Sequence, residues 1–278
     1  MAKKLVALIT GASSGIGKET AKKLIDDGYS VYAAARRVDK MKDLEELGAG
    51  IIRMDVSDEA SMKKGVEKII EKEGSIDILI NNAGYSLQSV LEDVPISDAK
   101  MQMEVNLFGP AMLITMCLPF MRKNKFGKIV NVSSIMGKMY SPAGSWYVAS
   151  KHALEGLSDC LRLEVKQFGV DVIIIEPGLI RTEISGVTVK QTSKFSKSAA
   201  YNNMTGIAID IFKRVQRFGS SPSVIANTIS KAIKAKRPKT RYKNGRMSRL
   251  PMFMFKILPD KLLDYAYSLK FSKMKAQT

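Results

Sequence analysis

Short apolar runs alternate with amphipathic stretches along most of this chain. The apolar runs have the length of β-strands, several are rich in Val and Ile, and they occupy residues 5–10, 30–35, 51–55, 76–81, 128–133 and 170–176. Helical spacing of apolar residues is found over 16–27, 39–47, 57–73, 109–123 and 147–168. Continuously apolar strands separated by helices are typical of a parallel sheet buried on both faces. The pattern therefore predicts an α/β fold, a doubly wound parallel sheet of the Rossmann-like type.

The length of 278 residues suits a single domain of this kind with additions at its C-terminal side. We expect a main domain over 1–236 and a C-terminal extension over 237–278. Within the main domain, residues 178–219 show no clear strand pattern and carry many Ser, Thr and Lys residues. This stretch is predicted to form a mobile lid. The remaining expected elements are a helix over 222–236, an edge strand near 241–243 and a helix over 260–271.

The formal net charge of +17 is concentrated near the C-terminus. Residues 231–278 contain 14 Lys and Arg but only 2 Asp and Glu, whereas the rest of the chain carries 30 basic and 25 acidic side chains. A basic tail without interleaved aromatic residues on a strand platform does not favour a nucleic-acid partner. We therefore expect none.

The two cysteines, Cys117 and Cys160, lie in separate helical patterns, which favours reduced thiols and a cytoplasmic protein. With a single histidine besides, no metal site is expected. No apolar run reaches the roughly 18 to 20 residues that span a bilayer, so neither a transmembrane helix nor a signal peptide is predicted. Peripheral contact with a membrane stays open.

A glycine-rich turn at residues 10–17 directly follows the first predicted strand and opens the first predicted helix. Glycines allow positive φ and close backbone approach, and a helix N-terminus presents N–H donors to a pyrophosphate. This context predicts a dinucleotide site. The candidate residues of the turn are Gly11, Ser13, Ser14, Gly15, Ile16 and Gly17.

Further motifs follow the turn in a fixed order. They are Asn81-Asn82-Ala83-Gly84, Asn106, Ser133-Ser134, Tyr147-Val-Ala-Ser-Lys151 and Pro177-Gly178. With this ordered set, residues 3–182 resemble the short-chain dehydrogenases/reductases. The C-terminal region more loosely resembles members similar to 17β-hydroxysteroid and retinol dehydrogenases. The resemblance implies a Rossmann-like oxidoreductase that uses a nicotinamide cofactor.

The end of the second predicted strand bears on the choice of cofactor. An acidic residue there would accept the ribose hydroxyls of NAD, but this chain has Arg36 and Arg37. Two guanidinium groups suit a 2′-phosphate by charge and geometry, so NADP(H) is predicted. The alternative is that both arginines are only solvated, because the glycine turn lacks a basic residue. The resemblance adds further cofactor contacts: Asp55 and Val56 at the adenine, Asn82, Ala83 and Gly84 at the adenosine ribose, Pro177 and Gly178, and Ile180 and Thr182 at the nicotinamide carboxamide.

Tyr147 and Lys151 are four residues apart on a predicted helix, so their side chains share one face. A nearby ammonium is expected to lower the pKa of the Tyr147 phenol and fit it for proton transfer. The resemblance implies that Ser134 orients the substrate oxygen and that Asn106 holds a water linking Lys151 to solvent. It also implies that Lys151 binds the nicotinamide ribose.

The predicted reaction interconverts a carbonyl and an alcohol on a hydrophobic substrate of steroid, retinoid or acyl-chain type. Apolar lid residues and Met103, Met112, Met136 and Met139 are expected to wall its pocket. The apolar segment between Pro251 and Pro259 either covers the cleft or rests on an anionic bilayer, and the two prolines favour the first. The resemblance implies a homo-oligomer, a dimer or tetramer. The competing hypothesis is a catalytically silent NADP(H)-binding regulator with a basic interaction tail.

Overall fold

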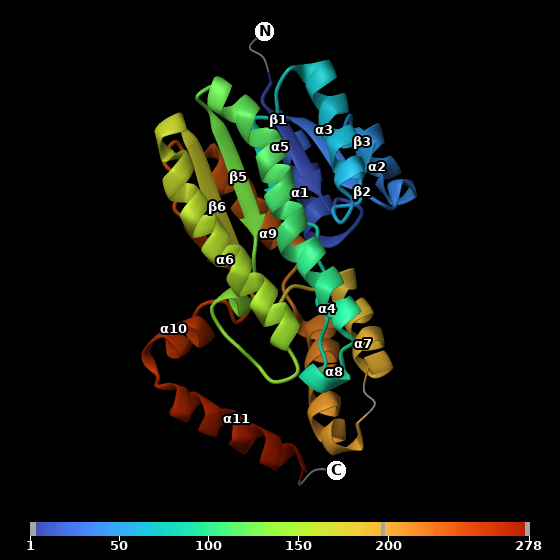
Figure 1. Ribbon diagram of the computed structural model, residues 1–278, viewed down its shortest axis with the longest axis vertical. Helices are drawn as coiled ribbons and strands as arrows, with labels where there is room; N and C mark the ends of the chain where they lie inside the picture. The colour runs from blue at the N-terminus through green and yellow to red at the C-terminus, as the bar shows by residue number, and fades with distance from the viewer. Residues whose placement is uncertain (1–3, 196–197, 276–278) are drawn as a thin grey trace.

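A seven-stranded sheet forms the centre of the computed structural model, which describes residues 4–195 and 198–275 (Figure 1). Its strands are β1 (Val6–Thr10), β2 (Ser30–Ala35), β3 (Gly50–Arg53), β4 (Ile78–Asn81), β5 (Gly127–Val132), β6 (Val170–Pro177) and β7 (Arg241–Asn244). The order is β3-β2-β1-β4-β5-β6-β7, and every neighbouring pair is parallel. The predicted fold class is confirmed. All carboxyl ends of the strands therefore lie at one edge of the sheet.

Helices cover both faces of this sheet (Figure 1). On one face, α1 (Gly15–Asp26), α2 (Lys42–Glu46) and α9 (Pro222–Lys234) bury side chains such as Leu24 and Ile229. On the other face, α3 (Glu59–Glu73), α5 (Gly109–Lys123) and α6 (Ser145–Val165) bury Ile69, Leu113 and Val165. The sheet is thus apolar on both sides, as the continuously apolar strands require. Asp58 caps α3 by accepting from two backbone N–H groups of its first turn.

One continuous helical stretch, Ile96–Lys123, is long and apolar enough by length and composition to cross a membrane. It joins α4 (Ile96–Met103), a π-helical turn (Glu104–Phe108) and α5. The sequence pattern did not predict such a candidate. Its apolar residues have a place within the fold, because Leu113, Ile114, Cys117 and Met121 are packed into the core beneath the sheet. A core helix of this kind meets the same criterion.

The residues beyond the carboxyl edge of the sheet form a helical cap (Figure 1). The predicted lid contains two helices packed together, α7 (Glu183–Phe195) and α8 (Asn202–Phe218), which the polar composition of 178–219 did not reveal. The predicted edge strand is β7, so the first part of the C-terminal extension completes the main sheet. The extension then forms α10 (Leu250–Ile257) and α11 (Asp260–Lys275), which are separated at Pro259.

Candidate active site

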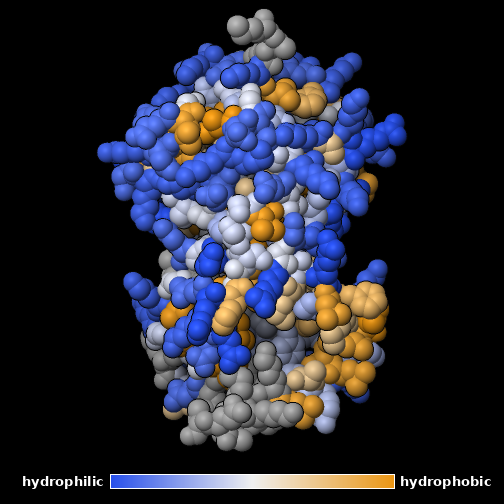
Figure 2. Space-filling view, turned by 180° about the vertical axis from the view of Figure 1, so that it is seen from behind, coloured by the Kyte–Doolittle hydropathy of each residue, from blue (hydrophilic) through white to orange (hydrophobic). Residues whose placement is uncertain are grey.

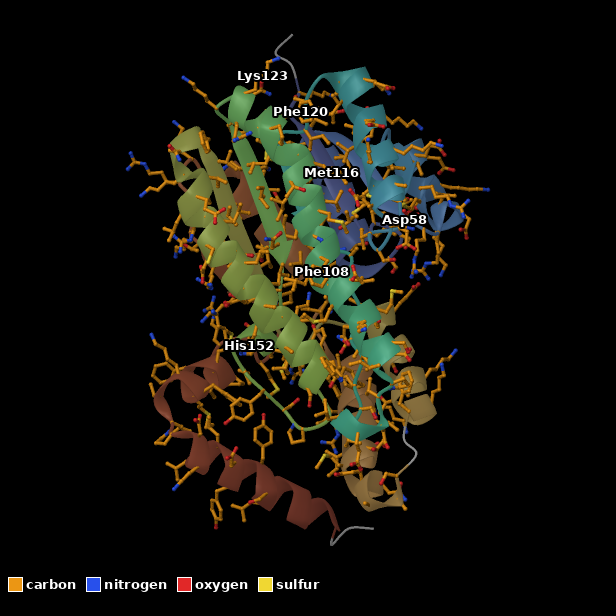
Figure 3. All side chains as sticks on the ribbon, in the orientation of Figure 1. Asp58, Phe108, Met116, Phe120, Lys123 and His152 are labelled. Carbon is orange, nitrogen blue, oxygen red and sulfur yellow. The ribbon has the colours of Figure 1, made fainter. Side chains whose placement is uncertain are left out.

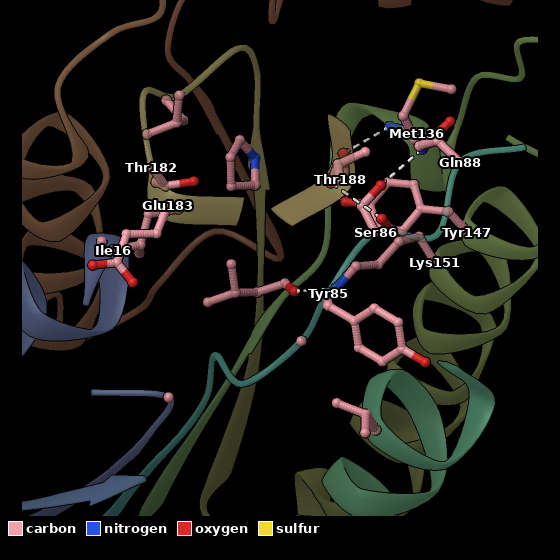
Figure 4. A pocket seen from close by; sticks show the side chains of 18 of the residues that line it. Ile16, Tyr85, Ser86, Gln88, Met136, Tyr147, Lys151, Thr182, Glu183 and Thr188 are labelled. Atoms are coloured by element: carbon pink, nitrogen blue, oxygen red, sulfur yellow. Dashed lines mark hydrogen bonds between the residues drawn. The ribbon is translucent and has the colours of Figure 1, made fainter. Parts of the chain in front are cut away.

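A large cleft of about 840 Å³ runs along the carboxyl edge of the sheet, from the glycine turn to Tyr267 of α11. Figure 4 shows its two ends, with Ile16 and Glu183 on one side and Tyr147 and Gln88 on the other. All predicted site residues line this cleft except Gly17 and Asn106, which lie behind its wall. In an open α/β sheet this edge is where ligands bind.

The glycine turn is held against the loop after β4. Asn82 donates from Nδ2 to the carbonyl of Thr10 at 2.9 Å, and the Thr10 hydroxyl accepts from the backbone N–H groups of Asn82 and Ala83. Gly11 has φ of +67°, and a Cβ there would lie 2.9 Å from the Cα of Ala83. A Cβ on Gly17 would collide with the Asn82 side chain and the Gly11 carbonyl. These glycines are required by the close packing of turn, helix and loop.

Arg37 folds back onto the glycine turn. Its guanidinium donates to the Ser13 hydroxyl at 3.2 Å and to the Ser14 hydroxyl at 3.3 Å. It also forms an ion pair of 3.1 Å with Glu183, the first residue of α7. A basic group therefore does contact the turn, and it comes from the loop after β2 instead of the turn itself. Arg36 is more exposed, and its nearest carboxylate is Asp55 at 3.7 Å.

Tyr147, Lys151 and Ser134 converge at the other end of the cleft (Figure 4). Ser134 follows β5 in extended conformation, and the Tyr147 and Ser134 hydroxyls lie within hydrogen-bonding reach. Lys151 is buried, donates to the Val132 carbonyl at 3.0 Å, and has its Nζ 6.0 Å from the centre of the Tyr147 ring. The four-residue spacing on α6 places Tyr147 and Lys151 on one face of the helix, and both line the cleft beside Ser134.

The electrostatics of this pair differ from the sequence-based expectation. Burial raises the pKa of Tyr147, and the hydrogen bond with Ser134 partly opposes this. Burial lowers the pKa of Lys151 to about 8, opposed by the charge of Glu155. The expected lowering of the Tyr147 pKa by Lys151 is not found, because the ammonium points to the Val132 carbonyl and burial dominates the phenol.

Asn106 sits in the π-helical turn between α4 and α5, an irregularity that is common at functional sites. Its Nδ2 donates to the Tyr85 carbonyl and the Ser150 hydroxyl, both at 3.0 Å, and its Oδ1 accepts from the Tyr85 N–H. A Cβ on Gly84 would lie 3.0 Å from Asn106 Oδ1 and 3.8 Å from Lys151 Nζ. Asn106 therefore holds the loop after β4 close to Lys151.

A buried acidic cluster beneath Lys151 was missed by the sequence analysis. Glu155, one turn after Lys151, is 2 % exposed, and Glu176 at the end of β6 is fully buried. Arg241 of β7 bonds Glu155 at 2.9 Å and Asp159 at 2.6 Å, and its Nε lies 3.6 Å from Glu176. Burial raises the pKa of Glu176, followed by the charge of Glu155. Glu155, Glu176 and Arg241 come from α6, β6 and β7, so only the folded chain brings them together.

The substrate end of the cleft is apolar with a small polar patch. Ile180, Met204 and Ile207 of the predicted lid and Met136 line it, as predicted. Met103, Met112 and Met139 do not line it, and Met101 takes part instead. Side chains that the sequence analysis did not single out complete the wall: Ala208, Ile211, Phe212 and Val215 of α8, Pro142 and Tyr267.

The polar patch consists of Ser86, Gln88 and Thr188. Gln88 donates to the Ser86 hydroxyl at 2.8 Å, and Thr188 donates to the Ser86 carbonyl at 3.1 Å. Both Ser86 and Gln88 are 5 % exposed and lie next to Tyr147 (Figure 4). A substrate with a polar group close to its reacting carbonyl and a long apolar remainder matches this lining.

The fold and this site define a nucleotide-binding oxidoreductase of the Rossmann type. A family model described as short chain dehydrogenase matches residues 5–193, and the chain belongs to this family. A solved short-chain dehydrogenase from Streptomyces avermitilis is similar over the whole chain and 99% of its own length, with a TM-score of 0.80 and 28% identity.

Two curated relatives also match over nearly their full length. The chain is 35% identical to the 3-ketodihydrosphingosine reductase of Bacteroides thetaiotaomicron, covering 94% of this chain and 96% of the relative. It is 30% identical to the NADPH-dependent 3-dehydrocapnine reductase of Ornithobacterium rhinotracheale, covering 98% and 99%. Both matches therefore cover more than nine tenths of this chain.

Proposed function

We propose that the protein is an NADP(H)-dependent reductase that converts a keto group on a long-chain lipid to an alcohol. The observation that carries this proposal is the convergence of Tyr147, Ser134 and Lys151 at the junction of a nucleotide groove and an apolar pocket. Both Tyr147 and Lys151 are present and correctly spaced, so a catalytically silent regulator has no observation in its favour.

NADPH would supply the hydride to the carbonyl carbon. Tyr147 donates the proton to the carbonyl oxygen, and its raised pKa keeps the phenol protonated at neutral pH. Ser134 donates a hydrogen bond to the same oxygen and holds it against Tyr147. Lys151 binds the nicotinamide ribose hydroxyls and sets the cofactor in register with the substrate. Asn106 fixes the loop that carries Gly84 beside Lys151.

The preference for NADP(H) is supported by the position of Arg37. Its guanidinium lies on Ser13 and Ser14, so three donors are gathered where the 2′-phosphate of a dinucleotide would sit beyond β2. The acidic residue that would select NAD is absent from the end of β2. The name of the Ornithobacterium relative, an NADPH-dependent reductase, also supports NADP(H).

The substrate class is supported by the lining of the pocket and by the relatives. A 3-keto sphingoid base carries a long alkyl chain beside amino and hydroxyl groups. The Ser86 and Gln88 side chains would face those polar groups, and Met204, Ile207 and Phe212 would face the chain. One relative is named a 3-ketodihydrosphingosine reductase and another a 3-dehydrocapnine reductase. A steroid or retinoid has no polar group at this position to pair with the buried patch.

Assembly as a homodimer or tetramer is part of this proposal. Exposed apolar side chains include Phe108 of the π-helical turn before α5, at 48 %, and Leu163 of α6, at 66 %. Phe108, Met116 and Phe120 lie along the length of the α4–α5 helix in Figure 3. Exposed apolar surface of this kind is commonly buried between subunits.

The test is NADPH oxidation measured with a panel of ketones: 3-keto sphingoid bases of decreasing chain length, simple long-chain ketones, steroids and retinal. The proposal expects kcat/KM to rise with chain length and to be highest where a polar group flanks the ketone. Gln88→Leu should reduce the advantage of the polar group and leave the chain-length dependence intact. Equal rates on steroids and on sphingoid ketones would contradict the substrate class.

A further inference from the structure

Helix α10 is apolar on two opposite faces. On its inner face, Met252 is 6 % exposed and packs with Ile135 and Met139, and Phe255 packs beside them. On its outer face, Leu250, Phe253, Met254 and Ile257 recur at i, i+3, i+4 and i+7, the spacing of one helical stripe. They are 70 %, 59 %, 43 % and 58 % exposed, respectively. The fold therefore buries the apolar residues of the inner face of α10 and leaves those of its outer face exposed.

The outer stripe continues onto α11. Leu262, Tyr265 and Leu269 share one face of that helix and are 54 %, 62 % and 41 % exposed. The opposite face carries Leu263, which is buried, and Tyr267, which lines the cleft. Figure 2 shows these hydrophobic residues gathered over α10 and the start of α11, at the lower right, on a surface that is otherwise mostly hydrophilic. We call the seven exposed residues of the two stripes the outer apolar face.

Acidic and basic side chains lie on different sides of α10 and α11. The acidic residues of α11, Asp260 and Asp264, fall on the inner side of the helix with Tyr267, and their charges add to burial in raising the pKa of Tyr140. Basic side chains border the outer apolar face instead: Arg249, Lys256 and Lys261 are all exposed. An apolar face with a basic border complements an anionic bilayer, whose acyl region accepts the apolar side chains and whose headgroups attract the cations.

The inner side of the same two helices borders the substrate end of the cleft, where Tyr267 of α11 is a lining residue and Met252 and Phe255 of α10 pack behind the lining residues Ile135 and Met136. The Tyr267 hydroxyl donates to the Tyr140 carbonyl at 2.7 Å, and the rings of Tyr140, Phe255 and Tyr267 pack against one another. The element with an apolar outer face is thus also the wall of the pocket. A molecule held in a bilayer against that face would be separated from the pocket only by α10 and α11.

We propose that the outer apolar face of α10 and α11 docks the protein on an anionic phospholipid membrane, from which the lipid substrate enters the cleft. Membrane docking is inferred from the exposed side chains and charges of the outer apolar face alone, whereas the entry of substrate rests on the proposed function. Docking places the apolar stripe at the level of the upper acyl chains and Arg249, Lys256 and Lys261 at the headgroups. The substrate end of the cleft, with Tyr267 in its wall, then lies next to the layer in which a long-chain ketone is dissolved.

Docking is tested by flotation of the full chain with phosphatidylcholine vesicles that contain or lack 30 mol% phosphatidylglycerol. The variant Phe253→Ser/Ile257→Ser removes two large side chains from the outer apolar face. The control Leu47→Ser/Ile96→Ser removes two that are 52 % and 60 % exposed elsewhere on the surface. We expect wild type and control to float with the anionic vesicles, less so at high salt, and the test variant to bind at least ~10-fold more weakly.

Equal flotation of all three proteins, or none with anionic vesicles, would overturn the proposal. So would a wild-type dimer that dissociates in the test variant, as measured by light scattering, because a second copy would then cover the face. Activity separates this proposal from the proposed function. On a water-soluble short-chain ketone all three proteins should be equally active. On a long-chain ketone in anionic vesicles only the test variant should slow, and loss of activity on both substrates would point to a damaged fold.

Discussion

Arg37 and Glu183 form an ion pair of 3.1 Å that joins the end of β2 to the first residue of the lid helix α7. Lys40 adds a second contact to Glu183 at 3.4 Å, and these charges hold the pKa of the Glu183 carboxyl below its usual range. The Glu183 carboxylate therefore pairs with the same guanidinium, that of Arg37, to which the 2′-phosphate would bind. Binding of NADP(H) would exchange one anion for another at Arg37, and the exchange would act directly on the start of the lid.

Glu183→Gln is expected to lower the KM for NADPH by about two- to fivefold, because a half-exposed ion pair that competes with the phosphate is worth only a fraction of a kcal/mol to about 1 kcal/mol. The KM for NADH should hardly change, since that cofactor has no phosphate to compete with. Asp39→Asn, which removes another exposed carboxylate of the same region, is the control for general charge. Equal changes with both cofactors would contradict the competition.

Arg37→Ala is expected to raise the KM for NADPH about tenfold or more, in keeping with the loss of hydrogen bonds to a charged group. Arg36→Ala should have a smaller effect, because Arg36 is 74 % exposed and does not reach the glycine turn. Initial rates at varied NADPH and NADH concentrations measure both. An equal loss with the two cofactors would refute the assignment of Arg37 to the phosphate.

The pH dependence of ketone reduction should report on Lys151. Its pKa is lowered to about 8, so the ammonium loses its charge at a lower pH than an ordinary lysine does. Because burial raises the pKa of Tyr147, the phenol stays protonated over the same range. We expect kcat/KM to be constant near pH 6 to 7 and to fall above about pH 8. A profile that stays flat up to pH 10 would contradict the need for a charged Lys151.

Glu155→Gln should move this fall to lower pH, because the Glu155 charge is what raises the Lys151 pKa against burial. The variant should also lose stability, since Glu155 pairs with Arg241 and Lys138 in a buried setting. Asp159→Asn removes the other ion pair of Arg241, at a more exposed position. The Asp159 charge is not among the causes of the Lys151 pKa shift. Asp159→Asn should therefore destabilise the fold in thermal unfolding without shifting the pH profile. An unshifted profile for Glu155→Gln would exclude this positioning role.

The parts of the fold and site that could be predicted from sequence are those set by local chemistry. Apolar strands, the glycine turn and the spacing of Tyr147 and Lys151 each carry their own signal, and the parallel sheet then fixes which edge they share. Most of the predicted cofactor residues accordingly line the cleft.

The parts that could not be predicted depend on contacts between distant segments. Glu183 meets Arg37 across 146 residues, and Arg241 meets Glu155 across 86. The direction of the Tyr147 pKa shift was wrong because burial is a property of the folded site, not of the residue spacing. The helix α7 was missed because Ser, Thr and Lys residues interrupt its apolar positions. The helix α8 was missed although its sequence is amphipathic, because the composition of the whole segment 178–219 was read as that of a loop. The role of α11 as a wall of the cleft could not be predicted, because it depends on the folded position of Tyr267 among the lining residues.

The most direct test of the central claim is the turnover of Tyr147→Phe on a ketone that the wild type accepts, with NADPH binding measured in parallel by fluorescence. The substitution removes the proton donor and keeps the ring. It should lower kcat by about 10²- to 10⁴-fold, the range of general acid catalysis, and leave the Kd for NADPH nearly unchanged. Turnover equal to that of the wild type would show that Tyr147 does not deliver the proton.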